Sequence, residues 1–149
     1  MIALDTNVLA RLLLQDDAAQ YKRAKTLFET RQVFTTTVTV MLELVWVLES
    51  RNVVPEKINM ALNALMNLPN FKPERADALR EALRNYKNGM GFADALHLAL
   101  SDGQEKFLTF DKAFVRRAKQ LDLSPQVLLT WLVIAVSSSS FSFSSSTSS

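Results

Sequence analysis

The sequence has no cysteine and a single histidine, His97, in 149 residues. Without cysteine the chain forms neither disulfides nor thiolate metal sites, which fits the reducing cytoplasm where we expect it to act. It also lacks the G-x-S-x-G turn of serine hydrolases and the glycine pattern of phosphate-binding loops. These absences exclude cysteine nucleophiles, this class of serine hydrolase and P-loop nucleotide hydrolysis.

Long apolar runs are missing as well. No stretch approaches the roughly 20 apolar residues that span a bilayer, so we expect no membrane association. The N-terminus has no basic leader and Asp5 interrupts its apolar residues, so we expect no signal peptide. Hydrophobic residues make up 48% of the chain and charged residues 21%, which is typical of a globular domain with one core.

The net charge is small, at +2, but its distribution is informative. If four of the 15 carboxylates hold a cation, the remaining 11 face 17 Lys and Arg side chains. Such a surface suits an anionic polymer that is bound through its phosphates. Many domains with a pI near 9 do not bind nucleic acid, so charge alone leaves both interpretations open.

Residue patterns predict strands that alternate with helices. Strands are expected at residues 2–5, 33–37, 106–110 and 126–129, with a short edge strand at Phe71. Helices are expected from Thr6 or Asn7 as the cap to Leu14, from Asp17 onward, and at 39–51, 55–68, 73–86, 92–100 and 112–120. This alternation predicts an α/β fold with a mainly parallel sheet covered on both faces.

The expected helix at 39–51 is apolar on nearly every side. We therefore predict that it is largely buried, with Trp46 in the core rather than serving as a platform for base stacking. Glu43 is the exception within this helix. A buried carboxylate without a partner is costly, so Glu43 requires a cation or a basic side chain beside it.

Four acids on separate elements form the candidate site: Asp5, Glu43, Asp94 and Asp111. Asp5 and Asp111 end predicted strands, and ligands of open α/β sheets bind beyond the carboxyl ends of the strands. Asp94 lies in the first turn of its helix. Taken singly, each acid is also explained as a helix cap, a turn residue or an ion-pair partner.

As a group, the four acids favour a metal site. Clustered carboxylates repel one another unless a cation neutralises them. A site built from oxygen ligands, with no cysteine and at most one histidine, suits Mg²⁺ or Mn²⁺. A cation in such a site activates water and stabilises charge on phosphate oxygens, so phosphoryl chemistry needs no nucleophilic side chain.

Several neighbours of the acids are candidates for supporting roles. Thr6, Asn7 and Thr109 flank the acids and are expected to hold them or a metal-bound water in place. His97 follows Asp94 by one helical turn, and we favour a packed core histidine over a proton shuttle. The helix after Asp111 is basic and either contacts RNA phosphates or is a solvated face; its candidate residues are Lys112, Arg116, Arg117 and Lys119.

The chain changes character near residue 130. We expect the folded domain to span residues 1–130. Residues 131–136 are apolar, and we expect Trp131 and Leu132 to dock on the domain. Residues 137–149 contain ten serines, a composition that cannot form a second core and predicts disorder.

At these residues the chain resembles the PIN-domain family. The matching segments are Ile2–Asn7, Thr39 with Glu43, Phe92–His97 and Thr109–Asp111, in this order along the chain. Within the family, the size and lack of added domains resemble the VapC-type toxins of VapBC toxin–antitoxin systems. The serine-rich end departs from the family pattern.

The resemblance implies an α/β/α sandwich and an Mg²⁺- or Mn²⁺-dependent endonuclease that acts on RNA. It also implies a homodimer that is inhibited by a cognate antitoxin. The four acids fall on the family's acidic positions, with Thr109 and Thr6 or Asn7 in support.

Three alternatives stay open at this point. The first is a PIN nuclease that processes nucleic acid without being a toxin. The second is a binding module whose acids hold a structural cation. The third, a phospho-acceptor domain, is disfavoured because one acid, not a pair, follows the first strand, and no lysine follows Gln126.

Overall fold

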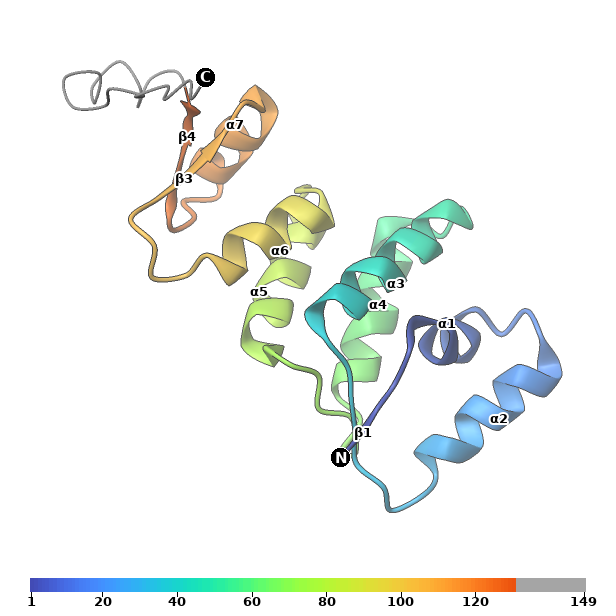
Figure 1. Ribbon diagram of the computed structural model, residues 1–149. Helices are drawn as coiled ribbons and strands as arrows, with labels where there is room; N and C mark the ends of the chain where they lie inside the picture. Colours follow the sequence, from blue (N-terminus) through green and yellow to red (C-terminus); the bar gives the residue numbers. More distant parts are fainter. Residues whose placement is uncertain (131–149) are drawn as a thin grey trace, which may run out of the picture. The chain divides into compact units, whose positions relative to one another are not determined.

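The computed structural model describes residues 1–130; the predicted apolar segment and disordered tail at 131–149 lie outside the described residues. The chain forms two compact units, Met1–Leu100 and a second that begins at Ser101 (Figure 1). The first contains β1 (Ile2–Ala3), α1 (Thr6–Leu14), α2 (Ala18–Phe28), β2 (Phe34–Thr35), α3 (Val38–Ser50), α4 (Pro55–Met66), α5 (Ala76–Lys87) and α6 (Phe92–Leu100). The second contains β3 (Lys106–Thr109), α7 (Lys112–Gln120) and β4 (Gln126–Leu129).

The strands of the first unit are short because the chain turns into a helix directly after each one. β1 and β2 pair in parallel, with Ile2 opposite Phe34. The prediction that Thr6 or Asn7 caps the first helix is wrong, since Asp5 is the cap. Thr37, expected at the end of a strand, instead caps α3 by accepting a hydrogen bond from the Val40 backbone N–H.

Helices make up most of the first unit. α3 contacts α1, α4 and α6, and α5 packs against α4 and α6. Their contacts enclose a core of fully buried side chains: Leu9, Met41, Leu44, Ile58, Leu62, Leu79 and Ala95. The predicted start of α4 at Pro55 is confirmed, because proline at the first helical position costs no hydrogen bond.

The predicted start of the next helix at Pro73 is wrong. The backbone N–H groups of Lys72 and Glu74 donate to the carbonyls of Phe34 and Thr36. The chain around Pro73 therefore runs alongside β2, next to the predicted edge position Phe71, which forms a parallel bridge with Phe34. α5 begins only at Ala76, once this pairing has ended.

The second unit is a strand–helix–strand motif. β3 and β4 pair in parallel, with Lys106 opposite Gln126, and α7 contacts both strands. The rings of Phe107 and Phe114 meet edge to face at 5.4 Å between centroids. This contact packs the buried face of α7 against the strand pair.

The predicted α/β organisation with parallel strands is confirmed. Among the described residues, however, the strands form two two-stranded sheets, where the sequence predicted one. No helix in residues 1–130 is long and apolar enough to cross a membrane.

Candidate metal centre and nucleic-acid interface

Asp5 sits where β1 passes into α1. The Leu4 backbone N–H donates to the Thr35 carbonyl at 2.8 Å, and the buried Thr36 hydroxyl donates to the Leu4 carbonyl at 2.9 Å. These bonds fix the backbone just before Asp5. Asp5 Oδ1 accepts a hydrogen bond from the Thr6 N–H at 2.7 Å, while Oδ2 accepts none within residues 1–130. One carboxylate oxygen thus stabilises the helix start and the other remains available to a ligand.

The two predicted neighbours of Asp5 differ in their surroundings. Thr6 is 3% exposed, and its Oγ1 has no hydrogen-bond partner in the described part of the chain. A buried hydroxyl without a partner costs free energy unless a bound ligand or water supplies the bond. Asn7 is exposed on α1 and lines a small hollow with Val8 and Arg11.

Glu43 is exposed, so the prediction of a buried carboxylate is wrong. α3 buries Met41, Leu44 and Leu48, whereas Glu43, Trp46 and Glu49 are exposed. The apolar composition of α3 therefore predicts more burial than the structure shows. Solvent hydrates Glu43, and the fold does not require an ion-pair partner for it.

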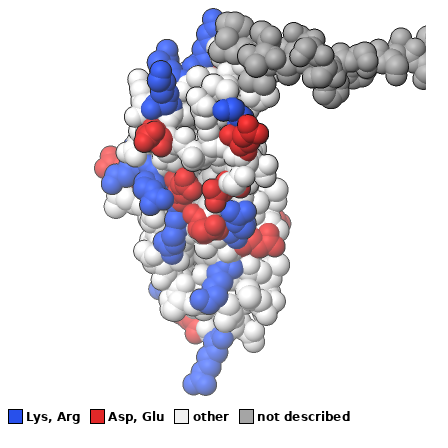
Figure 2. All heavy atoms as spheres, turned by 90° about the vertical axis from the view of Figure 1, so that its left-hand side faces the viewer, with Lys and Arg blue, Asp and Glu red and all other residues white. Residues whose placement is uncertain are grey.

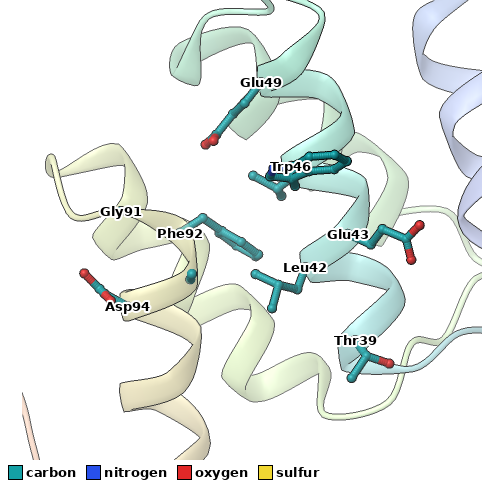
Figure 3. Close-up of a pocket in the computed structure, with 10 residues that line it drawn as sticks. Thr39, Leu42, Glu43, Trp46, Glu49, Gly91, Phe92 and Asp94 are labelled. Carbon is teal, nitrogen blue, oxygen red and sulfur yellow. The ribbon is translucent and has the colours of Figure 1, made fainter.

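A pocket of about 550 Å³ lies between α3 and the start of α6 (Figure 3). Glu43 from α3 and Asp94 from α6 both line it, although their carboxylates point away from each other. A Cβ atom built on Gly91 would lie 3.9 Å from Asp94 Oδ2, so the Asp94 side chain lies close to the backbone at the helix start. The fold thus brings two of the four predicted acids to one pocket.

Asp111 lies in the second unit, at the start of α7. Its Oδ1 accepts hydrogen bonds from the N–H groups of Ala113 at 2.9 Å and Phe114 at 3.1 Å. Its own N–H donates to Thr109 Oγ1 at 3.1 Å. Thr109 therefore contacts the acid that it was expected to support, and Asp111 acts as a helix cap.

The four acids are divided between the two units of the chain. Asp5, Glu43 and Asp94 belong to the first unit and Asp111 to the second. Within residues 1–130, no three His, Asp or Glu side chains lie close enough together to hold one ion. The donor set nevertheless fits a hard divalent cation, because each side chain offers carboxylate oxygens and Asp5 adjoins the unpartnered Thr6 hydroxyl.

A family model of the PIN domain matches residues 2–120. The chain belongs to the PIN-domain family. All four acids lie inside the matched range. PIN domains are generally nucleases, and they typically use divalent metal ions. No curated protein matches the chain in a comparison of sequences.

Two side chains of this PIN domain that were predicted to lie in the core are exposed. Trp46 is 67% exposed and lines the pocket between α3 and α6. His97 is also exposed, so it is not a packed core histidine. Both helices present one face to the interior and another to solvent, and apolar neighbours in sequence do not reveal which face a residue occupies.

Glu49 was missed by the sequence reasoning. It lines the same pocket, and its Oε1 accepts a hydrogen bond from the Tyr86 hydroxyl at 2.9 Å. Burial and the neighbouring Glu49 carboxylate raise the pKa of Tyr86 above its usual value. The available signal was spacing, since Glu43, Trp46 and Glu49 recur every three residues along α3.

A basic groove of about 630 Å³ lies on the second unit of the PIN domain. It is lined by Lys112, Arg116 and Lys119 of α7, together with Val115, Gln120 and Leu129. Arg117 is exposed but does not line this groove. Basic and acidic side chains are interspersed on the face in Figure 2, so a local groove gives a better-defined phosphate site than overall charge.

Two substitutions at Asp111 separate its role as a helix cap from a role in activity. Asp111→Ala should lower the free energy of unfolding by about 1 kcal/mol, because both cap hydrogen bonds are lost. Asp111→Asn should stay within a few tenths of a kcal/mol of the parent, since asparagine is an equally good cap. Urea denaturation measures both, with the exposed Asp102→Ala as the control. Equal stability of the parent and Asp111→Ala would contradict this assignment.

Proposed function

We propose that this PIN domain is an Mg²⁺- or Mn²⁺-dependent endoribonuclease that hydrolyses RNA phosphodiester bonds. The observation that carries the proposal is the family match over residues 2–120, which includes Asp5, Glu43, Asp94 and Asp111. Further support comes from the pocket that Glu43 and Asp94 share, and from the absence of a cysteine nucleophile.

In this proposal the carboxylates of Asp5, Glu43 and Asp94 hold the ion, with Asp111 as a fourth ligand on the strength of the sequence. A divalent ion bound to them supplies an activated water and stabilises charge on the phosphate. Asp5 keeps one oxygen outside its cap hydrogen bond, and exposed Glu43 changes rotamer at little cost. Thr6, Asn7 and Thr109 support the ligands, Thr109 through the Asp111 N–H.

Our more specific proposal is that the protein is the toxin of a type II toxin–antitoxin system. Its basis is the resemblance of the chain to VapC-type proteins, together with the PIN-domain match over residues 2–120. Under this proposal the protein acts in the cytoplasm, forms a homodimer and is bound by a cognate antitoxin. A PIN nuclease that processes RNA without being a toxin is the second candidate, and a neighbouring gene for a small antitoxin would discriminate between them.

Metal-dependent cleavage is the primary test. The full chain should cleave members of an RNA panel with Mg²⁺ or Mn²⁺ and lose this activity in EDTA. Asp94→Asn should reduce cleavage at least a hundredfold while still folding, because the amide keeps the shape but not the charge that binds the cation. Gel analysis of end-labelled RNA measures the rate, and circular dichroism checks the fold.

Asp102→Asn is the matched control, because Asp102 is an exposed acid outside the proposed ligand set. It should cleave at the parent rate. Undiminished metal-dependent cleavage by Asp94→Asn would contradict the assignment of the ligands. Metal binding without cleavage of any RNA would favour a non-catalytic binding module.

Substrate affinity should fall steeply with salt concentration. For single-stranded RNA, each phosphate contact contributes about 0.7 to the slope of log affinity against log salt. Arg116→Ala with Lys119→Ala removes two groove cations and should lower the slope by about 1.4. Arg117→Ala, which lies outside the groove, should change it less than either groove substitution. An unchanged slope in the double variant would rule out the groove as a phosphate site.

A further inference from the structure

Trp46 has an unusual position for a large aromatic side chain. It is 67% exposed, although tryptophan buries more apolar area than any other side chain when it packs. It lies one helical turn after Glu43 on α3, and its ring borders the pocket between Glu49 and Leu42 (Figure 3). An exposed flat ring beside a proposed nuclease site needs a role other than core packing.

The lining of the pocket restricts what can fill it. Leu42, Val45, Trp46 and Phe92 supply an apolar, partly aromatic wall, and Glu43, Glu49 and Asp94 supply carboxylates. Within the described residues, no Lys or Arg lines this pocket. Apart from an ion held by Glu43 and Asp94, the described lining of the pocket offers a phosphate no positive charge, whereas an uncharged planar ring gains stacking on Trp46. The chemistry therefore fits a nucleobase rather than the backbone of a nucleic acid.

Glu49 provides a way to distinguish between bases. Its Oε1 is held by the Tyr86 hydroxyl at 2.9 Å, which orients the carboxylate and leaves Oε2 without a hydrogen bond from residues 1–130. A carboxylate accepts from N–H donors on a base edge. Guanine is the base whose Watson–Crick edge carries two adjacent N–H donors, so it matches this acceptor best.

We propose that the pocket between α3 and α6 binds one unstacked nucleobase of the RNA, which stacks on Trp46 and, when it is guanine, donates to Glu49. This inference names a substrate subsite for the proposed nuclease and rests on that function for its substrate class. Single-stranded RNA is the form that supplies such a base, because its bases can swing out onto aromatic side chains.

Binding in EDTA tests the subsite separately from cleavage. The probes are two fluorescein-labelled hexamers, one of uridines only and one with a single guanosine among uridines. Fluorescence anisotropy of the full chain should show tighter binding of the guanosine hexamer. Trp46→Ala should weaken binding of both hexamers about tenfold, which is typical for loss of one base–aromatic stack.

Met60→Ala is the matched control, because Met60 on α4 is also 67% exposed and lies outside the pocket. It should bind both hexamers like the parent. Trp46→Leu keeps an apolar side chain but removes the flat face, so it should bind nearly as weakly as Trp46→Ala. Glu49→Gln should bring the ratio of the guanosine-hexamer affinity to the uridine-hexamer affinity toward one.

Two results would overturn the proposal. Parent-like binding by Trp46→Ala and Trp46→Leu would show that no base stacks there. Conversion of a dimer to a monomer by Trp46→Ala in sedimentation would assign the face to a second copy of the chain. If the RNA cleavage test fails but the Trp46 and Glu49 effects appear, the base subsite stands and the nuclease assignment falls.

Discussion

Parallel pairing of β1 with β2 is the constraint on which the first unit depends. Because the two strands run in the same direction, both end at the same edge and both pass directly into a helix. Hydrogen bonds from Leu4 to Thr35 and from Thr36 to Leu4 fix that edge. Asp5 consequently starts α1 where Thr37 starts α3, and Glu43 follows on the second turn of α3.

The two faces of α3 have different roles, one in the core of the first unit and the other at the proposed site. Met41, Leu44 and Leu48 are buried against neighbouring helices, while Glu43 and Trp46 face outward. The outward residues contribute little to burial, and whereas Glu43 is well hydrated there, the exposed Trp46 leaves a large apolar area in water. The pocket against α6 supplies a reason for both, since a proposed metal ligand and a proposed base platform then lie one turn apart.

Local sequence patterns predicted the bounds of helices and strands better than they predicted the tertiary contacts around them. The helices at 92–100 and 112–120 and the strand at 126–129 were predicted with the observed bounds, because glycine, aspartate and proline mark their ends. Pro73 failed as a helix start because its neighbours pair with β2, a tertiary contact that no local pattern contains.

The prediction of which α3 side chains are buried failed for a related reason. Apolar composition does not distinguish a core face from the wall of a pocket, so Trp46 was predicted to be buried and Glu43 was expected to need a partner. The pocket shared by Glu43 and Asp94 depends on how α3 meets α6. The four-carboxylate site stays a prediction, carried by the order and spacing of motifs along the chain.

Thermal unfolding with and without Mn²⁺ tests most directly whether these carboxylates bind a cation. An ion that binds only the folded chain stabilises it by about 2.7 kcal/mol at 100 times its dissociation constant, which corresponds to a rise in Tm of several degrees. Asp5→Asn keeps the helix cap but not the charge, so it should fold and lose most of this rise. Equal rises in the parent and in Asp5→Asn, or no rise in the parent, would contradict a carboxylate-bound metal in this PIN domain.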